Sequence, residues 1–192
     1  MTDKLVFDRD GAVASITFNN PQKRNAMSLE MWEGTTEYLD KLANDDGVRV
    51  LILRGAGGKA FVSGADISKF ESERSSQEAI TRYNTATSLT CKKLSQFPKP
   101  TLAQIDGFCI GGGLGIALSC DIRICDEGSR FAIPAAKLGL GYDLDSAKKL
   151  VDAVGPSHAK EIFFTARQID SDEASRIGLV NRVEGVGQVA DA

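Results

Sequence analysis

The stretch Ile105-Asp106-Gly107-Phe108-Cys109-Ile110-Gly111-Gly112-Gly113-Leu114 combines a short apolar segment with a run of three glycines. Residues 101–105 are apolar enough for a strand, and residues 114–118 are typical of a buried helix. A glycine-rich turn that opens a helix leaves backbone N–H groups without intrahelical partners. The stretch therefore predicts a strand, a tight turn and a helix whose first N–H groups are open to a ligand.

Two familiar glycine motifs do not explain the glycine-rich segments of this chain. The run that starts at Gly111 has Ile116 where the GxGxxG dinucleotide-binding pattern needs its last glycine. A phosphate-binding P-loop needs a glycine five positions before its Gly-Lys pair and a serine or threonine after it, but here those positions are Leu53 and Ala60. The sequence therefore supports neither nucleotide-binding motif.

A second small-residue turn, Phe61-Val62-Ser63-Gly64-Ala65-Asp66-Ile67, also follows a predicted strand. If the two turns meet, a backbone N–H from each could point at one oxygen and form an oxyanion hole. Glycine suits such a place because a bulky neighbour would hold a substrate carbonyl away from the backbone. The alternative is that these glycines only permit close packing.

The rest of the chain alternates between strand and helix patterns. Alternating apolar residues predict a hairpin over residues 5–18 with Asp10-Gly11 at its turn. Helical spacing predicts a helix over about residues 28–42, with Ser28 as N-cap, and one of roughly 20 residues that stops at Pro98. Further strands are expected at 48–53, 121–125, 129–133 and 179–183, and further helices at 146–154, 157–165 and 171–177. This alternation predicts a mixed α/β domain.

Composition excludes several functional classes. The 192 residues are 42% hydrophobic and 26% charged with a net charge of −3, which argues against disorder and gives no basic patch for nucleic acid or membrane. Four cysteines without a CxxC pair, and the single histidine His158, predict no metal site. We expect a cytoplasmic protein without a membrane span or signal peptide.

In this order and spacing, the motifs resemble the enoyl-CoA hydratase/isomerase (crotonase) superfamily along almost the whole chain. Besides the two glycine turns, the matching segments are residues 19–27, 120–123, 131–134, 138–141 and 178–183. The resemblance implies an α/β spiral of repeated ββα units, the ClpP/crotonase fold, that binds acyl-CoA thioesters. No separate cofactor is implied, because CoA is part of the substrate.

The resemblance also assigns binding positions. It implies that the backbone N–H groups of Ala65 and Gly112 hold the thioester oxygen while an enolate forms. It places the CoA moiety near Lys23, Arg24 and Ala26, and near Ala65-Asp66-Ile67. Lys23 and Arg24 are candidates for phosphate or adenine contacts, the alternative being plain surface charges.

The acid–base positions depart from the family pattern. Hydratases of the family carry glutamates at the positions of Gly115 and Ala135, and these residues hold no proton to transfer. Asp143 falls where the family's dienoyl-CoA isomerases keep a catalytic aspartate and its aromatic-acyl-CoA dehalogenases a nucleophilic one. The alternative is that Asp143 or Asp145 caps a helix beginning near Ser146, with Asp145 the expected cap.

These residues favour an acyl-CoA enzyme with isomerase-type chemistry through Asp143 over a hydratase. The alternative is a non-catalytic acyl-CoA binder or scaffold that retains the fold. Residues 1–183 are expected to form the acyl-CoA-binding core and residues 184–192 a weakly structured tail. Family members continue into C-terminal helices that build a trimer. We expect this segment to be missing from the sequence, and a homotrimer or dimer of trimers where it is present.

Overall fold

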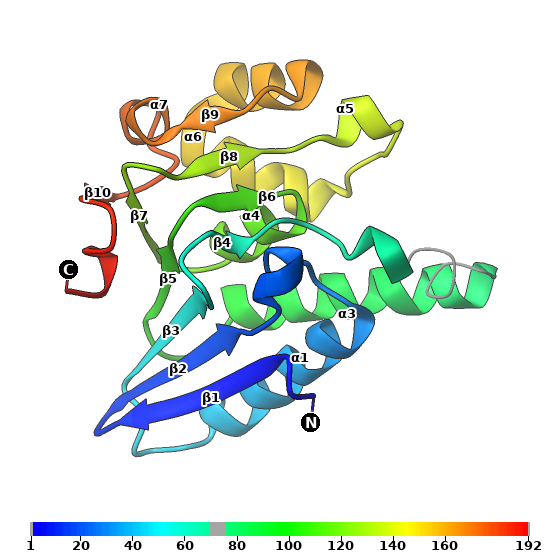
Figure 1. Ribbon diagram of the computed structural model, residues 1–192. Helices are drawn as coiled ribbons and strands as arrows, with labels where there is room; N and C mark the ends of the chain where they lie inside the picture. The colour runs from blue at the N-terminus through cyan, green and yellow to red at the C-terminus, as the bar shows by residue number, and fades with distance from the viewer. Residues whose placement is uncertain (1, 70–75, 192) are drawn as a thin grey trace.

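The computed structural model describes residues 2–69 and 76–191, apart from the side chain of Ile67, and arranges its strands in two sheets (Figure 1). The larger sheet has the order β1 (Leu5–Asp10), β2 (Val13–Phe18), β3 (Val50–Gly55), β5 (Thr101–Ile105), β7 (Ile122–Asp126) and β10 (Arg182–Glu184). The smaller sheet has the order β4 (Ala60–Val62), β6 (Phe108–Ile110), β8 (Arg130–Ala132) and β9 (Ile169–Asp170). Only the β1–β2 and β8–β9 pairs are antiparallel among these strands.

The helices complete a repeated ββα pattern. Their bounds are α1 (Leu29–Ala43), α3 (Gln77–Ser95), α4 (Gly112–Ala117), α5 (Ala135–Leu138), α6 (Leu144–Thr165) and α7 (Ser171–Arg176), with 3₁₀ turns η1 (Pro21–Lys23), η2 (Ile67–Lys69) and η3 (Val189–Asp191). Each successive unit gives one strand to the larger sheet and the next to the smaller sheet, namely β3 and β4, β5 and β6, then β7 and β8. The predicted α/β crotonase-like spiral is therefore confirmed.

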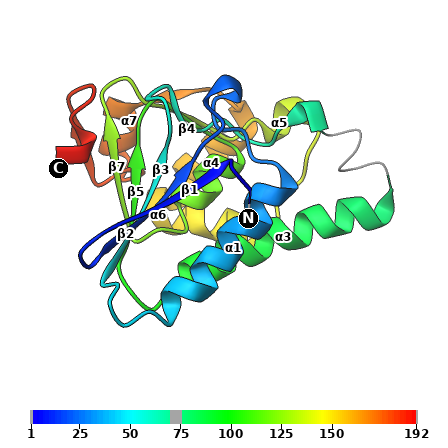
Figure 2. The same cartoon turned by 60° about the horizontal axis from the view of Figure 1, so that its bottom comes forward.

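Helices α1 and α3 lie side by side across one end of the molecule (Figures 1 and 2). Their contact buries Trp32 and Leu39 of α1 and Leu94 of α3, each at most 2% exposed. The hydroxyl groups of Thr36 and Thr90 lie 2.8 Å apart at this contact. No helix in the described ranges is both long and apolar enough to span a membrane.

The parallel pairing of the smaller sheet determines where the glycine turns lie. Strands β4 and β6 are neighbours and run in the same direction, so the loops that leave their carboxyl ends emerge at one edge. The loop after β4 carries Ala65, and the turn after β6 opens α4 at Gly112. The topology therefore brings together two turns that are 47 positions apart in sequence, from Ala65 to Gly112.

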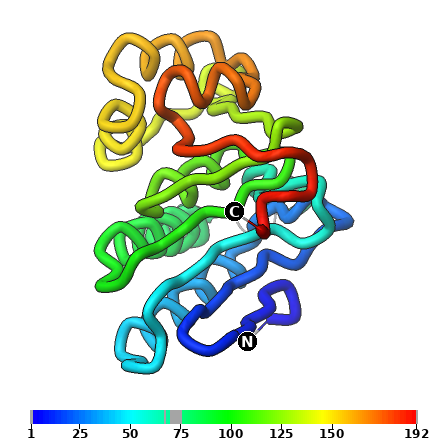
Figure 3. Tube along the Cα trace, turned by 90° about the vertical axis from the view of Figure 1, so that its left-hand side faces the viewer, coloured from blue at the N-terminus to red at the C-terminus, as the bar shows by residue number. Residues whose placement is uncertain are grey.

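Most predicted elements are present, with some differences. The hairpin and the N-cap position of Ser28 are confirmed. The strands β4, β6 and β9 were not predicted, because two or three residues are too few to show alternation. The predicted helices 146–154 and 157–165 form one element, α6, with a break at Gly155, whose φ is 76°. The tail also has structure: η3 buries Val189 and lies against β5 and β7 (Figure 3).

Candidate active site

The two predicted turns touch through their backbones. Gly64 has a φ of 111° and Gly111 a φ of 55°, conformations that favour glycine. A Cβ at Gly111 would lie 4.0 Å from the Cα of Gly64, and a Cβ at Gly64 would lie 3.6 Å from the carbonyl oxygen of Ile110. The two turns therefore lie side by side, and it is the positive φ at both positions, not a lack of space for a Cβ, that favours glycine.

Each turn presents one backbone N–H without an acceptor among the described residues. The N–H of Met27 donates to Gly64 O at 2.8 Å, and the N–H of Asp66 donates to Met27 O at 2.9 Å. The N–H of Ala65, between them in an extended bridge, points to the other side. Gly112 is the first residue of α4, and its N–H has no intrahelical partner.

A buried aromatic pair packs against the two turns from the core side. A Cβ at Gly112 would lie 3.2 Å from Cζ2 of Trp32, which is 1% exposed. The indole Nε1 of Trp32 donates to the hydroxyl of Tyr83 at 3.1 Å, and that hydroxyl donates to Met27 O at 3.5 Å. Sequence reasoning missed both aromatic residues. The only available signal was that Trp32 is the single tryptophan of the chain.

Lys23 and Asp66, two of the predicted CoA-binding residues, form an ion pair with Nζ and Oδ2 2.9 Å apart. Asp66 is 3% exposed and also accepts hydrogen bonds from the N–H and hydroxyl of Ser68. Burial raises the pKa of Asp66, but the hydrogen bonds from Ser68 and Lys23 outweigh it and bring the pKa below its usual value. The pair therefore ties η1 to the loop that carries Ala65.

Arg24 points elsewhere, although it follows Lys23 directly. Its guanidinium lies over the ring of Phe108, 4.9 Å from the centroid, and lines a cavity of about 390 Å³ that Lys59 also lines. Ala26 is 7% exposed and donates its N–H to Lys23 O. The predicted CoA-binding residues are thus divided between two places, with Lys23, Ala65 and Asp66 in one and Arg24 in the other.

One predicted CoA-binding position and the question of a metal site remain. Ile67 starts η2, but its side chain lies outside the described part of the structure. Among the described residues, no group of three His, Cys, Asp or Glu side chains is placed to hold a metal ion.

The two positions where hydratases carry acid–base glutamates differ in their surroundings. A Cβ at Gly115, in α4, would have no atom within 4 Å, so this side of the helix faces open space. Ala135 is the first residue of α5 and is 6% exposed. Neither residue carries a group that can transfer a proton.

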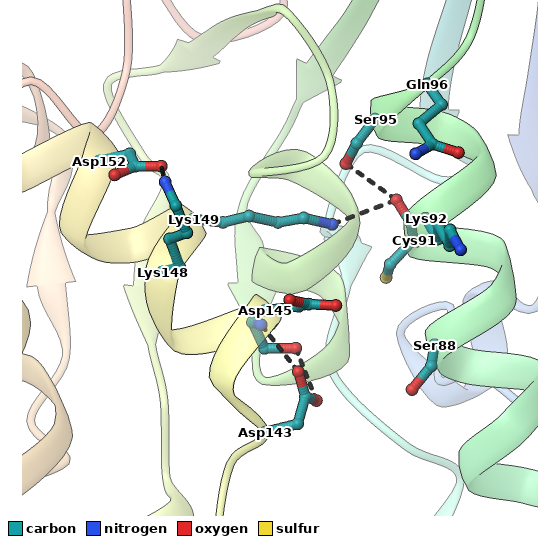
Figure 4. A pocket seen from close by; sticks show the side chains of 11 residues that line it. Ser88, Cys91, Lys92, Ser95, Gln96, Asp143, Asp145, Lys148, Lys149 and Asp152 are labelled. Carbon is teal, nitrogen blue, oxygen red and sulfur yellow. Dashed lines mark hydrogen bonds and ion pairs between the residues drawn. The ribbon is translucent and has the colours of Figure 1, made fainter.

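Asp143 is the N-cap of α6, so the prediction that Asp145 is the cap is wrong. Its carboxylate accepts hydrogen bonds from the N–H of Ser146 at 2.8 Å and from the hydroxyl of Ser146 at 2.9 Å (Figure 4). Asp145 cannot take this role because it already lies inside the helix, one residue after Leu144. Burial raises the pKa of Asp143, but the bonds from Ser146 outweigh it and lower the pKa overall.

The chain is similar in sequence to proteins of one enzyme family. The sequence model of the enoyl-CoA hydratase/isomerase family matches residues 8–192. The short-chain-enoyl-CoA hydratase of Clostridium acetobutylicum is 37% identical over 181 residues, which cover 94% of this chain and 69% of that protein. The mitochondrial Delta(3,5)-Delta(2,4)-dienoyl-CoA isomerase of Homo sapiens is 34% identical over 185 residues, which cover 89% of this chain and 55% of that protein.

Solved structures give the same result. The crystal structure of an enoyl-CoA hydratase/carnithine racemase from Magnetospirillum magneticum superposes with a TM-score of 0.94 at 35% sequence identity. The match covers 100% of this chain and 72% of that one. The enoyl-CoA hydratase of Bacillus anthracis superposes with a TM-score of 0.93 at 29% identity, covering 98% of this chain and 73% of that one.

Proposed function

The chain belongs to the enoyl-CoA hydratase/isomerase family, an enzyme family of lyases and isomerases, and from this premise we propose that it converts acyl-CoA thioesters through an enolate. In this proposal the N–H groups of Ala65 and Gly112 donate to the thioester oxygen. Negative charge gathers on that oxygen when a proton leaves the adjacent carbon, and fixed donors stabilise it without reorganising.

One observation carries the proposal: two backbone donors, neither with an acceptor among the described residues, extend from loops that touch. The loops meet at Gly64 and Gly111, and the open N–H groups belong to the next residues, Ala65 and Gly112. Ala65 and Gly112 are both partly exposed, so a ligand can reach their N–H groups, while β4, β6 and the buried Trp32 hold the two turns in place. Each such donor is typically worth about 3 kcal/mol in the barrier.

For the proton transfer we propose Asp143 as the acid–base group, which favours isomerisation over hydration. The ionised carboxylate of Asp143 can accept a proton from a substrate carbon, and the bonds from Ser146, which lower its pKa, weaken it as a base until a substrate displaces them. Returning that proton to a different carbon shifts the double bond without adding water. Hydration by the family's paired glutamates has no counterpart at Gly115 and Ala135.

A panel of enoyl- and dienoyl-CoA esters, with products identified by mass, tests this proposal. Isomerisation leaves the mass unchanged, whereas hydration adds one water. Asp143→Asn should abolish turnover while binding of a saturated acyl-CoA stays intact, because asparagine still caps a helix. Unchanged turnover in this variant would remove Asp143 from the mechanism.

The second candidate function is a non-catalytic acyl-CoA binder. It is favoured by the fact that both carboxylate oxygens of Asp143 already accept bonds from Ser146. Tight binding of a saturated acyl-CoA, with no turnover of any ester in the panel, would select this function over the enzyme.

A further inference from the structure

A cavity of about 250 Å³ lies between α3 and α6 (Figure 4). Asp143 lies at the α6 N-terminus, so the cavity begins at the residue proposed above for proton transfer. The other lining residues are Ser88, Cys91, Lys92, Ser95, Gln96, Asp145, Ser146, Lys148, Lys149 and Asp152. Cys91 is the only one of these side chains that is neither charged nor able to form strong hydrogen bonds. The cavity therefore combines charged and polar groups with walls made partly of aliphatic side-chain stems.

Lys149 reaches across this cavity from α6 toward α3 (Figure 4). Its Nζ donates to the hydroxyl of Ser119 at 2.7 Å and to the carbonyl oxygen of Cys91 at 3.1 Å. Both acceptors are neutral, and no carboxylate in the described ranges lies within 4.0 Å of this ammonium group. The neighbouring Lys148, by contrast, is paired with Asp152. Lys149 is therefore a half-buried cation that forms no ion pair with a described side chain, although Asp143, Asp145 and Asp152 line the same cavity.

Helix α4 connects Lys149 with the proposed oxyanion donors. The hydroxyl that binds Nζ belongs to Ser119, and it donates in turn to the carbonyl oxygen of Gly115 at 2.8 Å. Gly115 lies three residues after Gly112, which is about 4.5 Å along the helix. Because a Cβ at Gly115 would meet nothing within 4 Å, the space beside this part of α4 is open. The open N–H of Gly112 is at the first residue of α4, and the ammonium of Lys149 contacts Ser119, just beyond the last residue of that helix.

We propose that Lys149 is a specificity-determining residue that binds a carboxylate at the far end of the acyl group. The inference rests on the proposed function, since it places the thioester oxygen at Gly112. The substrate class is then the CoA esters of dicarboxylic acids, and a six-carbon chain is long enough to pass more than one turn of α4. Of the three lining carboxylates, Asp143 is bonded to Ser146 and Asp152 is paired with Lys148, whereas Asp145 has no side-chain partner among the described residues and so opposes binding of an anion most directly.

Calorimetric binding of adipyl-CoA and hexanoyl-CoA tests the inference, because these esters have equal chain lengths and differ only in the terminal carboxylate. The native chain should bind adipyl-CoA at least about tenfold more tightly, as a charge-assisted hydrogen bond predicts. Lys149→Met should remove this preference and leave hexanoyl-CoA binding unchanged, whereas Lys149→Arg should retain the preference. Lys160→Met is the matched control, because Lys160 is exposed on the same helix and does not line the cavity.

Several outcomes would overturn the inference. Equal binding of the two esters by the native chain would contradict it and leave the proposed function intact. An equal loss of both affinities in Lys149→Met would show that Lys149 only ties α6 to α3. Asp145→Asn gives a second readout that does not depend on that tie: adipyl-CoA should bind about threefold more tightly, with hexanoyl-CoA unchanged. Binding of neither ester would contradict the proposed function itself.

Discussion

The two glycine turns and the segment around α5 and the start of α6 differ in how tightly the chain packs. At the turns, a Cβ on Gly113 would lie 2.2 Å from the carbonyl oxygen of Val62, so no side chain fits. Around α5 and α6, Leu138 is 62% exposed and Leu144 is 81% exposed. The first region is determined by main-chain contacts, and the second leaves its side chains in solvent.

This difference separates the part of the chemistry that depends on the fold from the part that does not. The two N–H donors are positioned by the same contacts that hold β4, β6 and α4 together. The fold depends on those contacts, so a folded chain also has the donors in place. Of the two positions where hydratases carry glutamates, Gly115 lies where a side chain can change without a clash, because a Cβ there meets nothing within 4 Å. A chain can therefore keep the oxyanion site while its proton-transfer residues change.

The largest effect is expected from removing the N–H of Gly112. Proline is tolerated at the first position of a helix and lacks this donor, so Gly112→Pro should lower kcat by about 10²–10³-fold. Gly112→Ala is the control: it keeps the N–H, and its Cβ would be 3.2 Å from Trp32 in both variants. Steady-state kinetics on a converted ester, with circular dichroism to check folding, measures the difference. Equal losses in the two variants would contradict a role for the N–H.

A matched pair of alanine variants in α4 tests the packing side of the comparison. Gly113→Ala places a Cβ against the Val62 carbonyl and should destabilise the fold by about 3 kcal/mol. Gly115→Ala meets nothing and should be neutral or stabilising by up to about 1 kcal/mol, because alanine is the better helix former. Urea unfolding measures both. Similar costs at the two positions would show that the turn is not tightly packed.

The sequence predicted the mixed α/β class and the turns because their signals are local, whereas the ββα spiral was implied by the resemblance to the family. The glycines at 111–113 require a tight turn, and the apolar alternation of residues 13–18 requires a strand with one buried face. The support from Trp32 and Tyr83 could not be predicted, because their contact joins residues 51 positions apart on two helices. Helical periodicity places both residues on buried faces and says nothing about which side chain meets which.

The predicted CoA-binding pair shows a second limit. Lys23 and Arg24 are adjacent, and both are cations, so sequence alone gave them one role. The backbone of η1 ends at Arg24 in a left-handed conformation with φ of 51°, and the two side chains leave in different directions. One pairs with Asp66 and the other lies over Phe108. The left-handed backbone at Arg24, which the residue type does not determine, sets the direction in which its side chain leaves.

The smallest effect is expected at the cap of α6, where the comparison can be sharpened most. Asp143→Ala should destabilise the protein by about 1 kcal/mol near neutral pH, whereas Asp143→Asn should cost less because its amide oxygen still accepts the N–H of Ser146. The pKa of Asp143 is lowered in the folded chain, so its stabilisation is complete above the unfolded value of about 4 and is lost as pH falls through the folded value. The gap in unfolding free energy between the native chain and Asp143→Ala should therefore shrink at about pH 3, as urea unfolding at neutral pH and at pH 3 would show.

A gap that stays constant would mean that the carboxylate charge does not contribute to stability. Because asparagine keeps the cap, a loss of turnover in Asp143→Asn that exceeds its small stability change has to come from the missing carboxylate.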